Sequence, residues 1–366
     1  MATLDPHQPL SDAFTSAIST QLSAFLDDQT QVLQAISDRL EPLMRLSRQF
    51  TMGGKRLRPA FCFWGRVAAA GFPEDPAPLL RAAASLDLLH VSALVHDDVM
   101  DASDTRRGVP AAHRQLEAEH AATDGRGDSA TVGRAGAILL GDLLLMWSSE
   151  LLASAGLSTD ALAAAAPYVQ AMRTEVTCGQ FLDVAAQSAS HDNTPLTEQL
   201  AITSRVLEYK SARYTVMRPT QVGAALGGAD ATLIDDLGRF GSPLGRAFQL
   251  RDDLLGIFGD PAVTGKPAGD DLREGKRTML IAHALQAASP SGAALLDRYL
   301  GDPSLTESEV ARARDIITES GATDTVEDAI ATHYDEALRA LGEAHITTEG
   351  RTALIELARR SVDREF

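Results

Sequence analysis

The sequence is poor in cysteine and in positive charge. Its 366 residues include two cysteines, Cys62 and Cys178, too few for a disulfide scaffold, and we interpret both as small buried hydrophobes in a reducing compartment. Lys and Arg together number 33 against 50 Asp and Glu, giving a formal net charge of −17. This balance argues against a nucleic-acid partner, which needs a net basic face, and against polybasic docking to anionic lipid.

Long apolar runs are also missing. The candidate around Ala137–Trp147 is interrupted by Asp142, so it falls short of the about 18 apolar residues expected of a membrane span. The N-terminal stretch Met1–Phe14 has no basic segment followed by an apolar core, as a secretory signal would. We therefore predict a cytoplasmic protein without integral membrane association.

Aromatic residues are scarce, at 5% of the chain, and alternating strand patterns bounded by hairpin turns are absent. Val32–Leu46 instead carries apolar residues at the three-and-four spacing of a helix. Leu79–Val95 is almost continuously apolar, which predicts a helix buried on most sides. Further helices are expected at Ala137–Leu152, Ala161–Val184, Leu233–Phe258, Met279–Ala288, Leu305–Ile317, Thr325–Leu341 and Ala353–Val362. The fold class predicted is all-α.

The breaks between these helices are short. The longest are Gly71–Pro78, Thr123–Gly133, Ser190–Pro195 and Gly259–Gly269, and none has the length of a flexible interdomain linker. Although the chain length alone would allow two domains, we predict a single all-α domain over residues 1–366. Its first dozen residues are expected to fray.

Two acidic motifs lie on apolar helices, the first of them at the helix end. Asp97 and Asp101 are four residues apart, so a helix places both carboxylates on one face, while Asp98 points about 100° away. Stacked carboxylates suit a Mg²⁺ ion shared with a substrate phosphate. The second motif, Asp252-Asp253, lacks a third aspartate because position 256 is Gly256. We expect the two motifs to face each other across a cavity, sharing metal and a polyanion, since buried acidic patches are otherwise costly.

Cations accompany these carboxylates in turns. A Gly-rich turn, Gly53–Pro59, carries three of them, and Thr105–Gly108 carries two more just beyond Asp101. Single surface cations usually serve only solubility, but guanidinium and ammonium groups beside metal-type carboxylates suit phosphate oxygens. The pattern predicts a substrate with two anionic ends, one bound through Mg²⁺ and the other directly by Lys and Arg. His90, seven residues before Asp97, is interpreted as a core residue unless an anion lies nearby.

Seven motifs in order carry a resemblance to a known family. They are GGKRLRP (53–59), LVHDDVMDASDTRRG (94–108), GD (141–142), GQFLD (179–183), YKSARYT (209–215), FQLRDD (248–253) and TGKPAGDDLREGKRT (264–278). From about residue 50 to 285 the chain resembles the trans-isoprenyl diphosphate synthases, or polyprenyl synthetases, of the all-α terpenoid synthase fold. The resemblance implies a helical bundle with a central cavity, a homodimer, three Mg²⁺ ions per active site, and isopentenyl and allylic diphosphates as substrates.

The resemblance also assigns roles to residues. Mg²⁺ on the allylic diphosphate would be ligated by Asp97, Asp101 and Asp252, supported from behind by Asp98 and Asp253. The same diphosphate would be held by Arg106, Lys210, Lys266 and Lys276. Isopentenyl diphosphate would be held by Lys55, Arg58, His90 and Arg107. The reacting carbons would be lined by Phe248, Gln249, Lys210 and Ser211. Gly256 and Ser211, where threonine is commoner, depart from the family pattern. If Asp252 makes the metal bond, an aspartate restored at position 256 should change little.

The implied reaction is ionisation of the allylic C–O bond, attack by isopentenyl diphosphate and loss of a proton. Product length would depend on Ser92 and Ala93, small residues where the family places bulky aromatics in enzymes with short products, and on Leu89 one turn deeper. We predict geranylgeranyl diphosphate (C20), with farnesyl or longer products as alternatives. A terpene cyclase of the same fold is a third hypothesis, disfavoured by the paired anion sites. A catalytically silent regulatory subunit of a heteromeric prenyl synthase is a fourth, for which Gly256 is the one hint.

Overall fold

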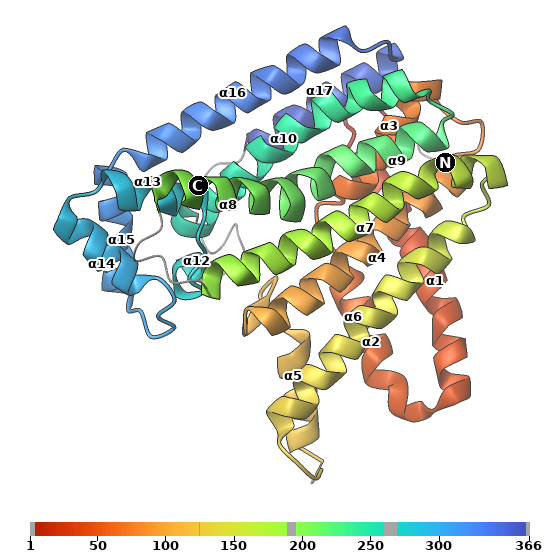
Figure 1. The fold of residues 1–366 in the computed structure, drawn as a ribbon. Coiled ribbons are helices and arrows are strands. Elements are labelled where there is room, and N and C mark those ends of the chain that lie inside the picture. The colour runs from red at the N-terminus through yellow and green to blue at the C-terminus, as the bar shows by residue number, and fades with distance from the viewer. Residues whose placement is uncertain (1–3, 124, 189–194, 260–268, 364–366) are drawn as a thin grey trace. The chain divides into compact units, whose positions relative to one another are not determined.

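The computed structural model describes residues 4–123, 125–188, 195–259 and 269–363. These residues are overwhelmingly helical, which confirms the predicted all-α class (Figure 1). The strands among them are the two-residue pair β1 (Thr105–Arg106) and β2 (Val109–Pro110), an antiparallel hairpin with Thr105 opposite Pro110. Lys266 lies outside the described residues.

Close contacts group the chain into two compact units. Unit 1 comprises residues 1–169, 219–234 and 345–357, and unit 2 comprises residues 170–218, 235–344 and 358–366. That the whole chain forms a single domain stays a prediction.

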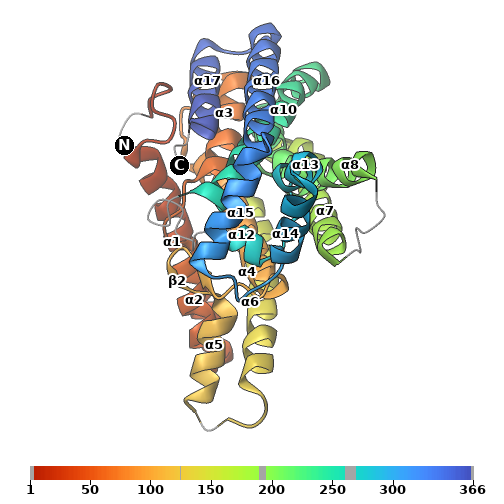
Figure 2. The same cartoon turned by 90° about the vertical axis from the view of Figure 1, so that its left-hand side faces the viewer.

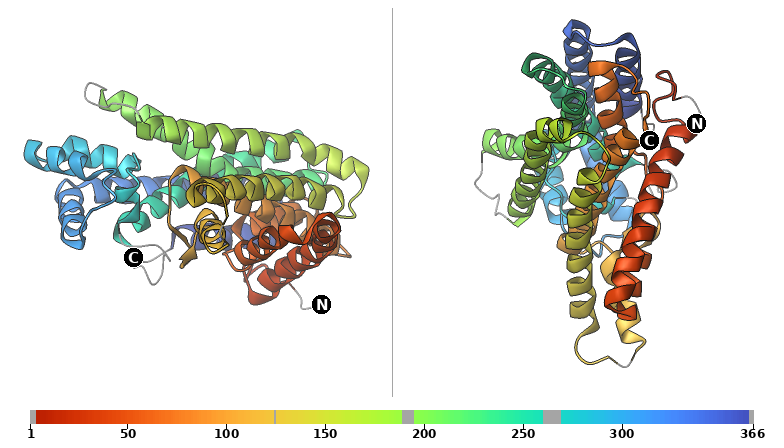
Figure 3. Two further views of the ribbon diagram at one scale, coloured as in Figure 1. Left: turned by 90° about the horizontal axis from the view of Figure 1, so that it is seen from below. Right: turned by 90° about the vertical axis from the view of Figure 1, so that its right-hand side faces the viewer.

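Unit 1 is built around α4 (Ala77–Met100), the almost continuously apolar helix of the sequence. It packs against α1 (Asp12–Ile36), α3 (Leu57–Ala70) and α6 (Ser129–Ala153), and its residues from Leu79 to Leu89 are buried nearly without a break. Figure 2 shows α5 (Ala112–Ala121) alongside α6, and Figure 3 shows α1 as the long red helix. The smaller elements are η1 (Asp38–Leu40), α2 (Glu41–Thr51) and α9 (Arg218–Leu226), whose residues from Pro219 belong to this unit.

The segment before α1 is tied down, which differs from the expected fraying of the first dozen residues. The indole N–H of Trp64 donates a hydrogen bond to the carbonyl of Pro9 over 3.1 Å, and Pro9 is buried. Ser11 then caps α1 by accepting from the backbone N–H of Phe14. A buried indole N–H needs an acceptor, so the backbone of the N-terminal segment is held in place.

The long helices of unit 2 are α16 (Ala322–Glu343) and most of α7 (Thr159–Ser188) and α10 (Ala231–Phe258). In α7 the residues after Val169 belong to unit 2, and in α10 those after Ile234. Of α17 (Thr348–Val362) only the residues after Leu357 belong to it. Its shorter helices are α8 (Leu196–Val206), α12 (Asp270–Arg273), α13 (Met279–Ala287), α14 (Pro290–Tyr299) and α15 (Glu307–Glu319). Between α8 and α9 runs η2 (Leu207–Met217), a π-helix that contains the whole YKSARYT motif.

Within the described part of the chain, two helices are long and apolar enough to cross a membrane by length and composition. In α4, 72% of the apolar window is buried inside the fold, as expected of a core helix. In α6 the buried share is 39%, so this helix leaves an apolar face uncovered.

Candidate active site

The first acidic motif occupies the last turn of α4. The helix ends at Met100, and the backbone N–H of Asp101 still donates to the carbonyl of Asp97 over 2.8 Å. Asp97 and Asp101 therefore lie one helical turn apart, as their spacing predicts. Asp97 is partly exposed, whereas the side chain of Asp98 is almost fully buried.

Asp98 holds an arginine beside this motif. The hairpin β1–β2 returns Arg106 to α4, where its Nε donates to Oδ1 of Asp98 over 2.8 Å and its Nη2 also contacts that oxygen. The same Nη2 lies 3.6 Å from Oδ2 of Asp97. A fixed guanidinium is thus placed next to the carboxylate predicted to ligate metal, and Asp98 acts by orienting it.

A cluster of guanidinium groups surrounds His90 on the same helix. Burial, followed by the nearby charges of Arg58, Arg107, Arg106 and Arg56, lowers the pKa of His90 well below its usual value, so the ring is neutral at pH 7. Of the cations predicted to bind the second anionic end, Arg58 and Arg107 therefore lie near the histidine predicted to join them. Excess positive charge around a neutral donor is the environment that an anion would favour.

Two turns shape this cationic cluster. Arg56 forms a buried ion pair with Asp87, and burial together with Arg107 lowers the pKa of Arg56 to about 10. Arg107 donates from Nη1 to the carbonyl of Phe50 over 3.1 Å. A Cβ on Gly54, whose φ is +87°, would lie 3.0 Å from Nη2 of Arg107. A glycine here lets the 53–59 turn approach the 105–108 turn, while Lys55 itself is exposed.

The residues predicted to set product length lie deeper along α4. Leu89 and Ser92 are buried, and Ala93 is partly buried. The hydroxyl of Ser92 donates to the carbonyl of Gly141 over 2.7 Å, so Ser92 faces α6. A Cβ on Gly141 would lie 2.3 Å from Nε2 of His96, which explains the glycine of the GD motif. Ala93, next to it, has no polar group and makes no such hydrogen bond to α6.

The second acidic motif lies near the end of α10. Arg251 turns to α16 and α17, pairing with Glu327 and donating to the carbonyl of Val362. Asp252 is exposed, and Gln249, one turn earlier, donates to Oδ1 of Asp253 over 2.8 Å. Burial, followed by the charges of Asp271 and Asp252, raises the pKa of Asp253 well above its usual value.

Gly256 is explained by a carboxylate from another element. A Cβ at position 256 would lie 1.9 Å from Oδ2 of Asp271, the second residue of α12. Oδ1 of Asp271 lies 3.2 Å from Nζ of Lys276, which also pairs with Glu274 over 2.6 Å. Asp271 therefore fills the space beside Gly256, where a third aspartate is missing. Its carboxylate also places Lys276 near the second acidic motif.

Lys210 lies in η2 and pairs with Asp183 of α7. A Cβ on Gly179 would lie 2.3 Å from the backbone nitrogen of Lys210, so the GQFLD motif supplies both the room and the counter-ion for this lysine. Ser211 follows it, partly buried. Sequence reasoning assigned no role to Asp183, Asp271 or Glu274, although all three stand in recognised motifs.

The donor set fits magnesium. Among the described residues no three or more His, Cys, Asp or Glu side chains converge as a ready-made metal cage. Mg²⁺ retains waters and is usually bound by one or two carboxylates together with substrate phosphates, so a closed cage is not needed. Asp97 and Asp101 offer hard oxygens of that kind at one helix end, and Asp252 offers an exposed one on α10.

Comparisons with known proteins agree with this chemistry. The sequence model of the polyprenyl synthetase family matches residues 41–317. The chain is 30% identical to the geranylgeranyl diphosphate synthase of Methanosarcina mazei over 95% of its length and 96% of that protein's. It is also 30% identical to the (2E,6E)-farnesyl diphosphate synthase of Mycobacterium tuberculosis, covering 98% and 97%. The structure of geranylgeranyl pyrophosphate synthase from Corynebacterium glutamicum, complexed with isoprenyl diphosphate and magnesium, superimposes with a TM-score of 0.91 at 40% identity, covering 97% of this chain and 99% of that one.

Proposed function

Because the chain belongs to the polyprenyl synthetase family and is a prenyltransferase, we propose that it condenses isopentenyl diphosphate with allylic diphosphates of five to fifteen carbons, mainly to geranylgeranyl diphosphate. The observation that carries this proposal is the end of α4, where two stacked carboxylates, an oriented arginine and a cationic cluster around a neutral histidine occur within one unit. Such an arrangement suits two anionic substrate ends.

The allylic diphosphate would be held by cations whose own partners fix their position. Arg106 is oriented by Asp98, Lys210 by Asp183, and Lys276 by Asp271 and Glu274. Magnesium, when bound by Asp97, Asp101 and Asp252 with three ions per site, would supply further positive charge for the departing diphosphate. These ion pairs leave less reorganisation to be done as the negative charge develops.

Isopentenyl diphosphate would occupy the cluster formed by Lys55, Arg58, Arg107 and His90. A neutral His90 can donate one hydrogen bond to a phosphate oxygen while the arginines supply the charge. Phe248 and Gln249 would line the reacting carbons and exclude water that would quench a carbocation. The released diphosphate is the base in this scheme, so the proposal needs no dedicated side-chain base.

The product length proposed is C20. Ser92 and Ala93 are small, and the next large residue expected on their side of α4 is Leu89, which is buried. Relatives of near-equal identity bear names for C15 and C20 products, so a farnesyl or longer-chain activity is the alternative that product analysis decides.

The functional form proposed is a cytoplasmic homodimer. Large apolar residues recur at helical spacing among the exposed positions of α6, including Leu139, 62% exposed, and Met146, 59% exposed. The same set includes Val132, Ile138 and Leu145. An identical helix of a second copy would cover these residues in an isologous contact.

The decisive assay uses the purified protein with Mg²⁺, radiolabelled isopentenyl diphosphate and C5, C10 or C15 allylic primers. We expect chain-length-resolved products ending at C20, loss of turnover with EDTA, and recovery when Mg²⁺ is added back. The matched control is Glu74→Gln, an exposed glutamate in the loop before α4, which should keep wild-type turnover. Absence of incorporation with every primer would instead support the hypothesis of a silent subunit.

A further inference from the structure

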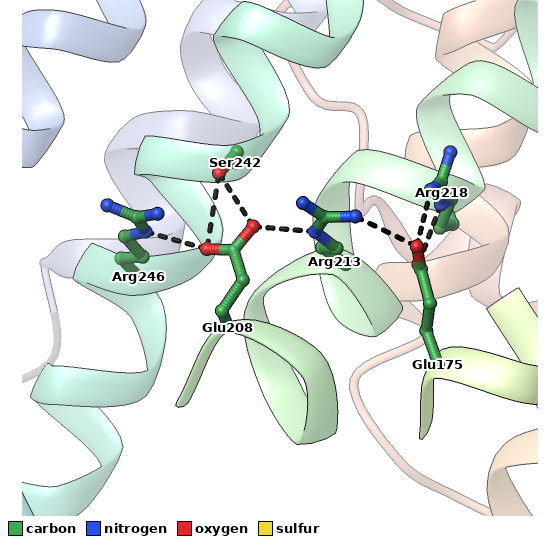
Figure 4. A network of polar contacts seen from close by, with 6 residues as sticks. All are labelled: Glu175, Glu208, Arg213, Arg218, Ser242 and Arg246. Carbon is green, nitrogen blue, oxygen red and sulfur yellow. Dashed lines mark hydrogen bonds and ion pairs between the residues drawn. The ribbon is translucent and has the colours of Figure 1, made fainter. Parts of the chain in front are cut away.

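A chain of ion pairs in unit 2 has no role in the chemistry described above. Its centre is Glu208, whose Oε1 accepts from Nε of Arg213 over 2.7 Å and whose Oε2 accepts from Nε of Arg246 over 2.7 Å. The hydroxyl of Ser242 donates to both oxygens. Figure 4 shows Arg213 lying between Glu208 and a second glutamate, Glu175.

Glu175 extends the chain to the start of α9. It accepts from Nη1 of Arg213 over 2.8 Å and from Nε and Nη2 of Arg218 over 2.8 and 2.5 Å. Two carboxylates and three guanidinium groups thus join α7, η2 and α10 with the residue that follows η2. We call these five residues with Ser242 the η2 clamp.

Both carboxylates of the clamp stay ionised. Burial works against ionisation of Glu208, whose side chain is 9% exposed, but the hydrogen bonds from Arg213 and Arg246 outweigh burial and hold its pKa below the usual value. Burial likewise opposes ionisation of Glu175, and Arg218 and Arg213 again lower its pKa. Charge-assisted hydrogen bonds of this kind are the strong ones in proteins.

The element that the clamp encloses is unusual. π-Helical turns in proteins are mostly single bulges at functional sites, whereas η2 runs for 11 residues. Its wide turns need space, which glycines provide: a Cβ on Gly245 would lie 2.3 Å from the carbonyl oxygen of Ala212, and one on Gly241 would lie 2.6 Å from Cα of Met217. With Gly179 beside Lys210, α7 and α10 together form a narrow slot for this backbone.

Lys210 lies inside the clamp, two residues after Glu208 and three before Arg213. Backbone hydrogen bonds join residues five apart in a π-helix and four apart in an α-helix. If η2 relaxed to α-helical hydrogen bonding, every side chain after the first altered turn would point in a different direction. Lys210 would then no longer be aimed where Asp183 meets it.

We propose that Glu175 and Glu208 are positioning residues that keep η2 in its π-helical register and so aim Lys210 at the allylic diphosphate. The proposal rests on the proposed function only in its last step, the role of Lys210. Neither glutamate touches substrate in this scheme. Both act through Arg213, which each of them holds from one side.

The test compares Glu208→Gln and Glu175→Gln with Glu198→Gln, an exposed glutamate on α8 that serves as the matched control. Glu208→Gln should raise KM for the allylic diphosphate at least tenfold and leave KM for isopentenyl diphosphate within twofold. Amide exchange across residues 207–217 should accelerate at least tenfold while exchange in α16 is unchanged. Equal rises in both KM values, or unchanged exchange, would overturn the proposal.

A double-mutant cycle separates positioning from general damage. With inorganic diphosphate and Mg²⁺ as the probe in calorimetry, Lys210→Ala and Glu208→Gln should each weaken binding, and Glu208→Gln should cost nothing further in the Lys210→Ala background. Additive losses would refute a route through Lys210. If Glu208→Gln does not fold, Glu175→Gln, which leaves the Arg246 contact intact, is carried through the same measurements.

Failure of the proposed function is distinguishable from failure of the clamp. If the wild-type protein shows no prenyl transfer, the exchange measurement still decides whether the glutamates hold η2. If Lys210→Ala binds diphosphate as tightly as wild type, Lys210 has no role in binding. The aiming part of the proposal is then wrong even where exchange confirms that the glutamates hold η2.

Discussion

The two acidic motifs, at the end of α4 and on α10, are built in different ways. At the end of α4 all three aspartates come from the last turn of one helix and its C-cap, and the buried middle one, Asp98, is engaged by a cation, Arg106. On α10 the third position is Gly256, and Asp271 arrives from α12 to fill the space. The first motif is therefore local in sequence, whereas the second is assembled from two elements.

This difference has an electrostatic consequence. Asp98 and Asp253 are both buried, yet Asp98 contacts a guanidinium and Asp253 contacts the neutral amide of Gln249. Burial beside Asp271 and Asp252 then raises the pKa of Asp253. Asp98 is thus paired with a cation of its own unit, whereas at Asp253 the neighbouring carboxylates and burial outweigh the charge of Lys276.

The largest effect on activity should come from removing an aspartate of the α4 motif. Asp97→Ala or Asp101→Ala should lower kcat/KM at least about 10²-fold, or roughly 3 kcal/mol of transition-state stabilisation, because a metal ligand is lost. The fold should survive, since both residues lie at a helix end and no core cavity is created. Steady-state kinetics with thermal unfolding checks both points, and near-normal turnover in either variant would be incompatible with the metal assignment.

Placing a third aspartate on α10 itself, at position 256, should lower the activity. From the motif alone Gly256→Asp would be expected to change little, but its Cβ would lie 1.9 Å from the Asp271 carboxylate. We expect Gly256→Asp to lower turnover with Mg²⁺ about tenfold, equivalent to about 1.4 kcal/mol. The steric part is isolated by Gly256→Ala, and the double variant Gly256→Asp with Asp271→Gly should recover activity. An active single variant would show that Asp271 moves aside at little cost.

The comparison can be sharpened within α4 by two substitutions that differ in what they contact. Ala93→Phe should shift products toward C15 or C10, because a phenyl group would close the path below the motif. Ser92→Phe also breaks the hydrogen bond to Gly141 and meets α6, so it should lower the melting temperature as well. Product chromatography with thermal unfolding measures both. Unchanged product lengths from a folded Ala93→Phe protein would remove the physical basis for the C20 assignment.

The local features of the site were predictable from sequence. Periodicity placed Asp97 and Asp101 on one face of α4, and Asp101, the C-cap of that helix, still bonds to the carbonyl of Asp97. Arg106 and Lys276 were assigned to the site from their motifs, but their partners were not foreseen, because Asp98 and Asp271 meet them only through a hairpin and a short helix. Such contacts depend on where the chain turns back.

Non-local packing explains what sequence reasoning missed. Nothing in the apolar pattern of YKSARYT distinguishes a π-helix from an α-helix, since the difference lies in hydrogen bonding that neighbouring backbones permit. The signal that could have found it is the set of glycines at 179, 241 and 245, each facing η2. Asp183 was visible in the GQFLD motif, but its pairing with Lys210 joins residues 27 apart.

The smallest predicted effect concerns the cationic cluster that accompanies only the α4 motif. Its neutral His90 has a pKa held well below the usual value by burial and by Arg58, Arg107, Arg106 and Arg56. The unfolded chain binds a proton at this histidine near pH 6.5 and the folded chain does not, so this contribution to stability is present above pH 6.5 and is lost as the pH falls. Between pH 7 and 5.5 the loss should be about 1 kcal/mol in the wild-type protein and absent at this site in His90→Gln.

Urea unfolding at the two pH values measures this loss of stability. The control is His333→Gln, which changes a histidine paired with Glu336 on α16 and should behave like wild type. His113 and His283 also have lowered pKa values, so the difference between His90→Gln and wild type is the quantity to compare. An identical pH dependence in both proteins would mean that His90 accepts a proton in the folded state and that the arginines do not act on it as described.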